Sequence, residues 1–109
     1  MVAKIFEITA NQFVNLAKEQ PLQLIDIREP NEYASENIAS ALSMPLSQLD
    51  INQLNALAQE KTLVFHCLSG MRTFNNASRF AEVNAAEIFI LTGGLNGWKR
   101  SGLVTVVNP

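Results

Sequence analysis

A single cysteine, Cys67, and a single histidine, His66, are present among the 109 residues of the sequence. With one cysteine the chain cannot form an internal disulfide, so its stability does not depend on an oxidising compartment. We expect neither a bound metal nor a cofactor. Any thiol chemistry of this chain must therefore use Cys67 without the help of a second, resolving thiol.

Long apolar runs and clusters of basic residues are also missing. The N-terminus lacks the extended apolar segment of a signal peptide, and no stretch approaches the roughly 18 apolar residues of a membrane span. The 8 Lys and Arg residues are outnumbered by 10 Asp and Glu residues, which gives a net charge of −2. This balance argues against nucleic acid or anionic membrane as a general partner, and we expect a cytoplasmic location.

The length and the 48% hydrophobic content suit one domain, residues 1–109, with an ordinary core. Short apolar segments alternate with segments of helical periodicity along the whole chain. We expect five strands, at residues 4–8, 22–27, 41–44, 62–66 and 87–91. Such alternation predicts an α/β fold with a mainly parallel five-stranded sheet that is flanked by helices on both faces.

Several residues predict where the helices lie. Thr9 and Gln12 have the spacing of a capping box at a helix start. After residue 72, Phe74 and Phe80 recur at helical spacing and are expected on the core face of a helix. Trp98 is expected to anchor a last helix in the core, and the apolar tail that follows is expected to lie extended against the domain.

The six residues 67–72, here called the Cys loop, lie between the predicted strand at 62–66 and the next helix. Cys67 lies at the carboxyl end of that strand, where open α/β sheets bind their ligands. Backbone N–H groups and a cation stabilise a thiolate. Gly70 lets the loop curl, and Arg72 offers a planar fork of donors for an anion. These features favour a reactive thiol over a small buried hydrophobe.

Four stretches of the sequence resemble rhodanese-type sulfurtransferases. The Cys loop and Thr73, CLSGMRT, resemble the family's active-site pattern C-x-x-G-x-R-[ST]. Residues 24–33, LIDIREPNEY, resemble L-I-D-V-R-E-P-x-E-Y, and residues 38–45, IASALSMP, resemble I-P-G-A-x-x-I-P. Residues 93–98, GGLNGW, resemble G-G-x-x-x-W. The four stretches occur in the order of the family, which implies the rhodanese fold.

The resemblance implies that Cys67 takes a sulfane sulfur from a small anionic donor such as thiosulfate and carries it as a persulfide. The acceptor must come from outside the chain, and cyanide, a thiol or a protein are the candidates. The resemblance further implies a cradle of backbone N–H groups around the sulfur, with Arg72 holding the anion. The residues expected to bind substrate in this way are Arg72, Leu68, Ser69, Gly70, Met71 and Thr73.

Two other functions are weighed against sulfur transfer. Cysteine phosphatases also use a strand, a Cys loop, an arginine and a helix, but their loop is one residue longer than the one between Cys67 and Arg72. The shorter loop suits a single sulfur atom better than a phosphoryl group. The second alternative is a sulfur-binding or redox-regulatory module without turnover. A Cys67 sealed in the apolar interior, with the loop amides turned outward, would argue against an enzyme.

His66 and two charged residues have structural interpretations. Neighbouring residues on a strand point to opposite faces, so His66 is badly placed to take the proton of Cys67. Asp26 and Arg28 at the end of another strand are expected to form a structural ion pair or a hydrogen bond that tethers the loop, rather than to bind substrate.

The sequence leaves open whether the chain is part of a longer, membrane-anchored protein. Residues 75–77, 86–89 and 97–99 are similar to rhodanese domains that precede two transmembrane helices in bacterial inner-membrane sulfurtransferases. The chain is therefore either the cytosolic part of such a protein, with an anchor beyond Pro109, or a complete small enzyme. The oligomeric state, the donor and the acceptor are open as well.

Overall fold

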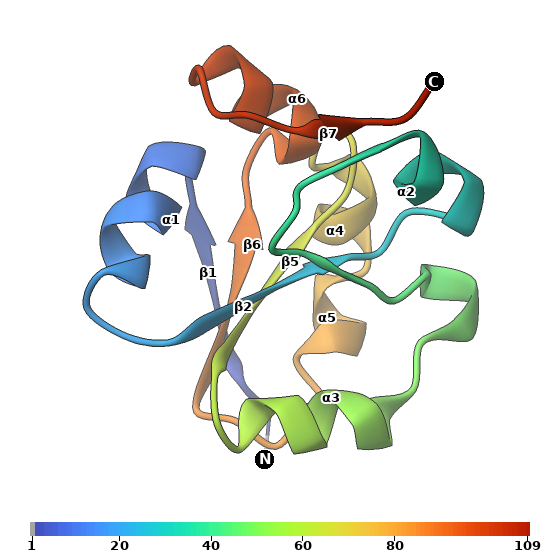
Figure 1. Ribbon diagram of the computed structural model, residues 1–109. Coiled ribbons are helices and arrows are strands. Elements are labelled where there is room, and N and C mark those ends of the chain that lie inside the picture. Colours follow the sequence, from blue (N-terminus) through green and yellow to red (C-terminus); the bar gives the residue numbers. More distant parts are fainter. Residues whose placement is uncertain (1) are drawn as a thin grey trace.

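A five-stranded parallel sheet forms the centre of the computed structural model, which describes residues 2–109 (Figure 1). Its strands lie in the order β1-β6-β5-β2-β4, and each neighbouring pair is parallel. This confirms the predicted fold class. The strands are β1 (Lys4–Ile8), β2 (Leu22–Asp26), β4 (Leu42–Ser43), β5 (Thr62–His66) and β6 (Glu87–Leu91).

The bounds of three strands, β1, β5 and β6, agree with the predicted ranges. The third predicted strand, at 41–44, was too long, because β4 has only two residues and Pro45 follows soon after it. Proline has no N–H to donate to a neighbouring strand, so it favours an early strand end. The carboxyl ends of β5 and β6 lie in the upper part of Figure 1, where the helices that follow β2, β5 and β6 gather.

The helices between the strands are short. Thr9 forms the expected capping box before α1, since its hydroxyl accepts from the Gln12 N–H at 3.2 Å and its own N–H donates to Gln12 Oε1 at 2.8 Å. Among residues 2–109, no helix is long and apolar enough to span a bilayer. The helices are α1 (Ala10–Ala17), α2 (Pro30–Ser35), α3 (Ile51–Ala58), α4 (Met71–Asn75), α5 (Ala77–Phe80) and α6 (Gly94–Arg100), with a 3-10 turn, η1 (Leu46–Gln48).

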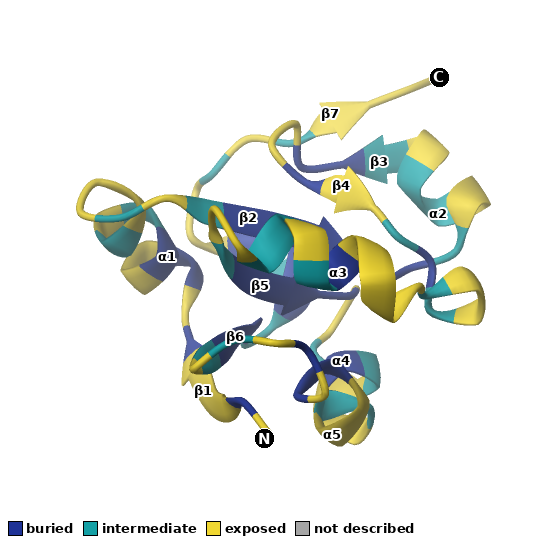
Figure 2. Cartoon of the chain, turned by 90° about the horizontal axis from the view of Figure 1, so that it is seen from below, coloured by how far each residue is buried: buried dark blue, intermediate teal, exposed yellow. Residues whose placement is uncertain are grey.

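The helices cover both faces of the sheet and create two apolar layers. On one face Phe65 of β5 packs with Leu54 of α3 and stacks on Phe80 of α5, with ring centroids 4.3 Å apart. On the other face Phe13 of α1 meets Trp98 of α6 edge-on, at 5.7 Å. Strands β2 and β5 are therefore almost entirely buried, as the dark blue ribbon in Figure 2 shows.

The C-terminal tail belongs to a second, two-stranded sheet. There β7 (Val106–Val107) pairs antiparallel with β3 (Glu36–Asn37). The Trp98 indole N–H donates to the carbonyl of Val104 at 2.9 Å, and this bond ties the tail to α6. The predictions of a buried Trp98 and an extended tail are confirmed. The pairing itself was not predicted, because two residues are too few for a periodic pattern.

The helix after the Cys loop differs from the prediction in two ways. It begins at Met71, so Arg72 lies in its first turn, and it is interrupted at Asn76, whose side-chain amide donates to the Arg72 carbonyl at 2.7 Å. Asparagine side chains that bond nearby carbonyls compete with helical hydrogen bonds in this way. The predicted core position of Phe74 is wrong, since its side chain is 63% exposed, whereas Phe80 is buried.

Leu54 offers a test of the packing between α3 and the sheet. Leu54→Ala removes a fully buried side chain and should lower the free energy of unfolding by about 2–5 kcal/mol. The matched change Leu42→Ala, at a side chain that is 42% exposed, should cost about 1 kcal/mol or less. Urea titration of both variants measures the difference, and equal losses would show that the layers are wrongly assigned.

Candidate active site

The Cys67 side chain continues the alternation of β5 and faces the same layer as Leu63 and Phe65. The Gly70 N–H donates to Cys67 Sγ at 3.2 Å, and the Thr73 hydroxyl oxygen lies 3.8 Å from the same sulfur. Cys67 is only 1% exposed. The Gly70 amide is thus turned toward the sulfur, as the sequence suggests, while the thiol is more deeply covered than a freely accessible nucleophile.

The carbonyl groups of the Cys loop are held by α6. The N–H groups of Leu95 and Asn96, in the first turn of α6, donate to the carbonyls of Cys67 and Leu68 at 2.9 and 3.0 Å. In a trans peptide the N–H points opposite to the C=O. The amides of Leu68 and Ser69 therefore point away from α6. The start of α6 fixes the orientation of these two peptide groups and leaves their N–H groups available on the other side.

Two glycines permit this close approach of α6 to the Cys loop. A Cβ on Gly94 would lie 2.4 Å from the Cys67 carbonyl oxygen, closer than any real contact of this kind. Gly70 has a φ of 99°, and a Cβ there would lie 3.1 Å from the Gly93 nitrogen. The sequence analysis identified residues 93–98 as a stretch that resembles the family, but it did not predict their contact with the Cys loop, because the two stretches are far apart in the chain.

Arg72 is paired with Glu32. Its Nη1 and Nη2 donate to Glu32 Oε1 and Oε2 at 2.8 and 2.9 Å, a bidentate bridge that joins α4 to α2. The hydrogen bonds from Arg72 lower the pKa of Glu32 from 4.5 to about 2, and those same bonds raise the pKa of Arg72. The guanidinium is therefore beside the Cys loop, but both its terminal nitrogens are engaged. Its predicted contact with a substrate anion stays a prediction.

The remaining predicted site residues contribute mainly their backbone. Leu68 and Met71 are 39% and 61% exposed, and Ser69 is exposed too, so these three side chains face solvent. Thr73 is fully buried, and its hydroxyl donates to the Gly70 carbonyl at 2.9 Å. The structure thus brings Gly70 and Thr73 together at the sulfur. Binding of substrate by the other N–H groups stays a prediction.

His66 contacts the backbone of Cys67 and not its sulfur. Its Nδ1–H donates to the Cys67 carbonyl at 3.0 Å, and Nε2 lies 3.5 Å from Asp26 Oδ2 without a hydrogen-bond partner among the described residues. Burial lowers the pKa of His66, so the ring is neutral. The Asp26 carboxylate is already bound by Arg28, whose Nη2 lies 2.8 Å away. The predicted structural ion pair is present, and His66 is not placed to act as a base on the thiol.

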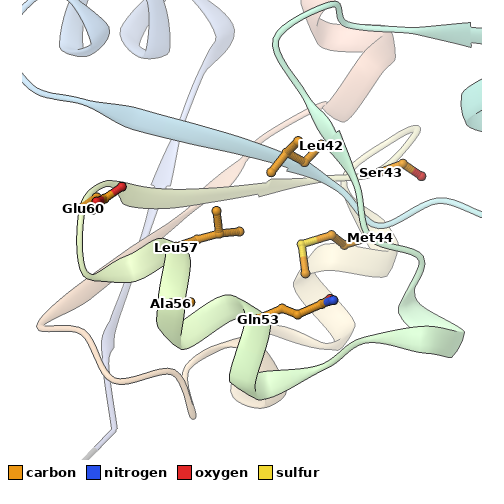
Figure 3. A pocket seen from close by; sticks show the side chains of 7 residues that line it. All are labelled: Leu42, Ser43, Met44, Gln53, Ala56, Leu57 and Glu60. Carbon is orange, nitrogen blue, oxygen red and sulfur yellow. The ribbon is translucent and has the colours of Figure 1, made fainter.

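A separate cavity of about 450 Å³ lies between β4 and α3 (Figure 3). Its walls include the apolar side chains of Leu42, Met44 and Leu57, with Glu60 at one end, and no residue of the Cys loop lines it. The only hydroxyl side chain in its lining is that of Ser43, with no histidine beside it to act as a base, so Cys67 stays the candidate nucleophile. In residues 2–109 no three His, Cys, Asp or Glu side chains gather closely enough to hold a metal ion.

A family model described as a rhodanese-like domain matches residues 9–101, so the chain belongs to the rhodanese-like domain family. It is 40% identical over 91 residues to the uncharacterized protein slr1261 of Synechocystis sp., covering 84% of this chain and 50% of that protein. It is 30% identical over 91 residues to a protein of Allochromatium vinosum named sulfurtransferase, covering 84% of each chain. It is 29% identical over 84 residues to the thiosulfate sulfurtransferase GlpE of Coxiella burnetii, covering 77% of this chain and 78% of that one.

Solved structures agree with the fold. The rhodanese-related protein of Thermoplasma volcanium superposes with a TM-score of 0.76 at 22% identity, covering 94% of this chain and 99% of that one. The BH2092 protein of Bacillus halodurans gives 0.78 at 19% identity, covering 94% and 77%. At these identities the likeness concerns the fold alone. The chain spans 50% of slr1261 and 60% of the Bacillus subtilis relative YqhL.

The contact between α6 and the Cys loop can be tested with a pair of glycine variants. Gly94→Ala and Gly102→Ala both place a side chain at positive φ, but only the Cβ at position 94 meets backbone, since nothing lies within 4 Å of position 102. Gly94→Ala should therefore cost about 1–3 kcal/mol more in unfolding free energy than Gly102→Ala. Urea titration gives both values, and equal costs would mean that the loop does not depend on this approach.

The Glu32–Arg72 pair predicts a particular dependence of stability on pH. The pKa of Glu32 is lower in the folded chain, about 2, than its ordinary value of 4.5. The pair therefore stabilises the fold at pH values above 4.5, and this contribution is lost as pH falls toward 2. Because both side chains are partly exposed, we expect a contribution of about 0.5–1 kcal/mol.

Glu32→Gln should be less stable than the wild type by that amount at neutral pH, and the gap should narrow as pH falls below 4.5 and close only below about pH 2. Denaturant titrations across this range measure the gap. Glu19→Gln, at an exposed carboxylate, is the matched control and should follow the wild type throughout. A gap that stays constant down to pH 2 would contradict the assigned role of the pair.

Proposed function

We propose that the chain is a sulfurtransferase that moves a sulfane sulfur from a donor such as thiosulfate to cyanide or a thiol. One observation carries the proposal: the only sulfur nucleophile lies at the carboxyl end of β5 with the Gly70 N–H directed at it, at 3.2 Å. An N–H directed at Sγ favours negative charge there, which a nucleophilic thiolate needs. The names of the relatives from A. vinosum and C. burnetii support this reaction class.

The reaction is written in two displacements on sulfur. The Cys67 thiolate attacks the outer sulfur of thiosulfate, a new S–S bond forms, and sulfite leaves with the electron pair of the old one. The acceptor then attacks the outer sulfur of the Cys67 persulfide, and the Cys67 thiolate is released. No electrons are gained or lost overall, so the cycle requires no cofactor.

The residues around Sγ have distinct tasks in this proposal. The Gly70 N–H holds the thiolate and then the inner sulfur. The Thr73 hydroxyl donates to the Gly70 carbonyl, and its oxygen lies 3.8 Å from Sγ, so it can turn its proton toward the anion when the thiolate forms. Arg72 keeps α4 in place through Glu32 and adds positive charge beside the loop. Leu68, Ser69, Met71 and Thr73 supply the further N–H groups of the cradle.

Because Cys67 is buried, this mechanism requires a local structural change before the donor can reach the sulfur. At 1% exposure the thiol cannot be reached by a donor in the resting arrangement. The groups that cover the sulfur must therefore shift when the donor binds, while the Gly70 N–H keeps its contact with Sγ. Leu68 and Ser69, next to Cys67 in the chain, are exposed, so such a shift does not require the sheet or its layers to change.

A second candidate function follows from the same burial. A covered thiol suits a sulfur-binding or redox-regulatory module that forms a persulfide or oxidised thiol without turnover. The two candidates differ in whether an acceptor regenerates the thiol rapidly. The cytoplasmic location and an anchor to the membrane stay predictions, because the chain spans only part of its relatives.

The decisive experiment measures the mass of the intact protein after incubation with thiosulfate. The wild type should gain one sulfur atom and lose it on addition of cyanide, with thiocyanate formed in catalytic turnover. Cys67→Ser should gain nothing and should lose essentially all transfer activity. No adduct on the wild type, or an equal adduct on Cys67→Ser, would refute the proposal. An adduct that cyanide does not remove would favour the regulatory module.

A further inference from the structure

The imidazole of His66 lies fully buried at the carboxyl end of β5, one residue before Cys67. Cys67 faces the layer of Phe65, and because side chains alternate along a strand, His66 faces the opposite layer. Its Nδ1 lies 3.0 Å from the carbonyl oxygen of Cys67, and its Nε2 lies 3.5 Å from Asp26 Oδ2. Both ring nitrogens therefore face oxygen atoms that accept hydrogen bonds.

A neutral imidazole carries one N–H, so it can serve only one of these two acceptors. The distances place the proton: 3.0 Å at Nδ1 is an ordinary hydrogen bond, while at 3.5 Å the Nε2 atom makes none. Arg28 binds the Asp26 carboxylate through Nε and Nη2, at 3.0 and 2.8 Å, so that carboxylate does not depend on His66 for a donor. The ring is thus held as the Nδ1–H tautomer. Within residues 2–109, Nε2 is the one buried side-chain nitrogen or oxygen atom without a hydrogen-bond partner.

The Cys67 carbonyl accepts hydrogen bonds from two directions. Its second donor is the Leu95 N–H in the first turn of α6, at 2.9 Å. A carbonyl oxygen has two lone pairs, so it takes both bonds at once, and two donors fix the plane of the peptide group more firmly than one. In a trans peptide the N–H points opposite to the C=O. The same two bonds therefore fix the direction of the Leu68 N–H, the next donor along the Cys loop.

We propose that His66 is a positioning residue for sulfur transfer: by holding the Cys67 carbonyl, it directs the Leu68 N–H toward the position of the transferred sulfur. The inference rests on the proposed function, in which the N–H groups of the loop stabilise negative charge on the reacting sulfurs. A hydrocarbon side chain of similar size would fill the same space without a bare Nε2 beside a carboxylate. What the histidine adds here is the single N–H that the Cys67 carbonyl accepts.

Two substitutions separate this role from packing. The amide nitrogen of asparagine stands at the same number of bonds from the backbone as Nδ1, whereas the amide nitrogen of glutamine reaches the place of Nε2. Persulfide formation with thiosulfate, followed in a single turnover by the mass of the intact full chain, should be about tenfold slower in His66→Gln than in the wild type, as the loss of one hydrogen bond implies. His66→Asn should recover to within about threefold of the wild type. If His66 only fills space, the larger glutamine should be at least as good as asparagine.

Val64→Ala is the matched control for lost packing. Val64 is fully buried two residues earlier on β5, on the same face as His66, and its side chain makes no hydrogen bond. The variant should lower the urea midpoint, as both His66 variants should, but leave the rate of persulfide formation by the folded protein unchanged. In the wild type, the ring nitrogen-15 NMR shifts of His66 should be those of the Nδ1–H tautomer.

Each contrary result is distinguishable. A His66→Asn rate no higher than that of His66→Gln, or wild-type ring shifts of the Nε2–H tautomer, would overturn the positioning role. The NMR measurement needs only the wild type, so it decides whether the bond to the Cys67 carbonyl exists even if neither variant folds. If the wild type forms no persulfide, the proposed function fails and the role of His66 in it fails too, whichever tautomer the ring shows.

Discussion

The candidate site depends on hydrogen bonds from the first turn of α6 to the Cys loop. The N–H groups of Leu95 and Asn96 hold the carbonyls of Cys67 and Leu68, and the absence of a side chain at Gly94 lets the two segments touch. The loop carbonyls are thereby occupied, and the amide of Gly70 is directed at the sulfur. The sheet places Cys67, but α6 determines which groups of the loop face it.

A second constraint comes from two ion pairs that hold chain segments near the Cys loop. Arg72 joins α4 to α2 through Glu32, while the buried pair of Asp26 and Arg28 lies at the end of β2. Arg28 and Arg72 therefore fix chain segments near the candidate site. The thiol is 1% exposed, so chemistry there requires a local shift of the groups around Sγ.

The sequence predicted the sheet, three strand bounds, the capping box at Thr9 and the place of Cys67, because each follows from local periodicity or from a motif. The predictions from sequence failed where contacts between distant segments of the chain determine the structure. Phe74 was expected in the core, but Thr73 takes the inner face of α4. The contact of Gly94 with the Cys loop and the pairing of β3 with β7 arise only when the chain is folded, and no local pattern encodes them.

The orientation of the Gly70 amide toward Sγ is the central claim, and amide NMR spectra of the isotopically labelled protein test it most directly. Conversion of Cys67 to its persulfide changes the group that accepts from Gly70, so the Gly70 signal should shift far more than those of β1 and return when cyanide removes the sulfur. A Gly70 signal that stays in place while mass measurements show the adduct would contradict the account.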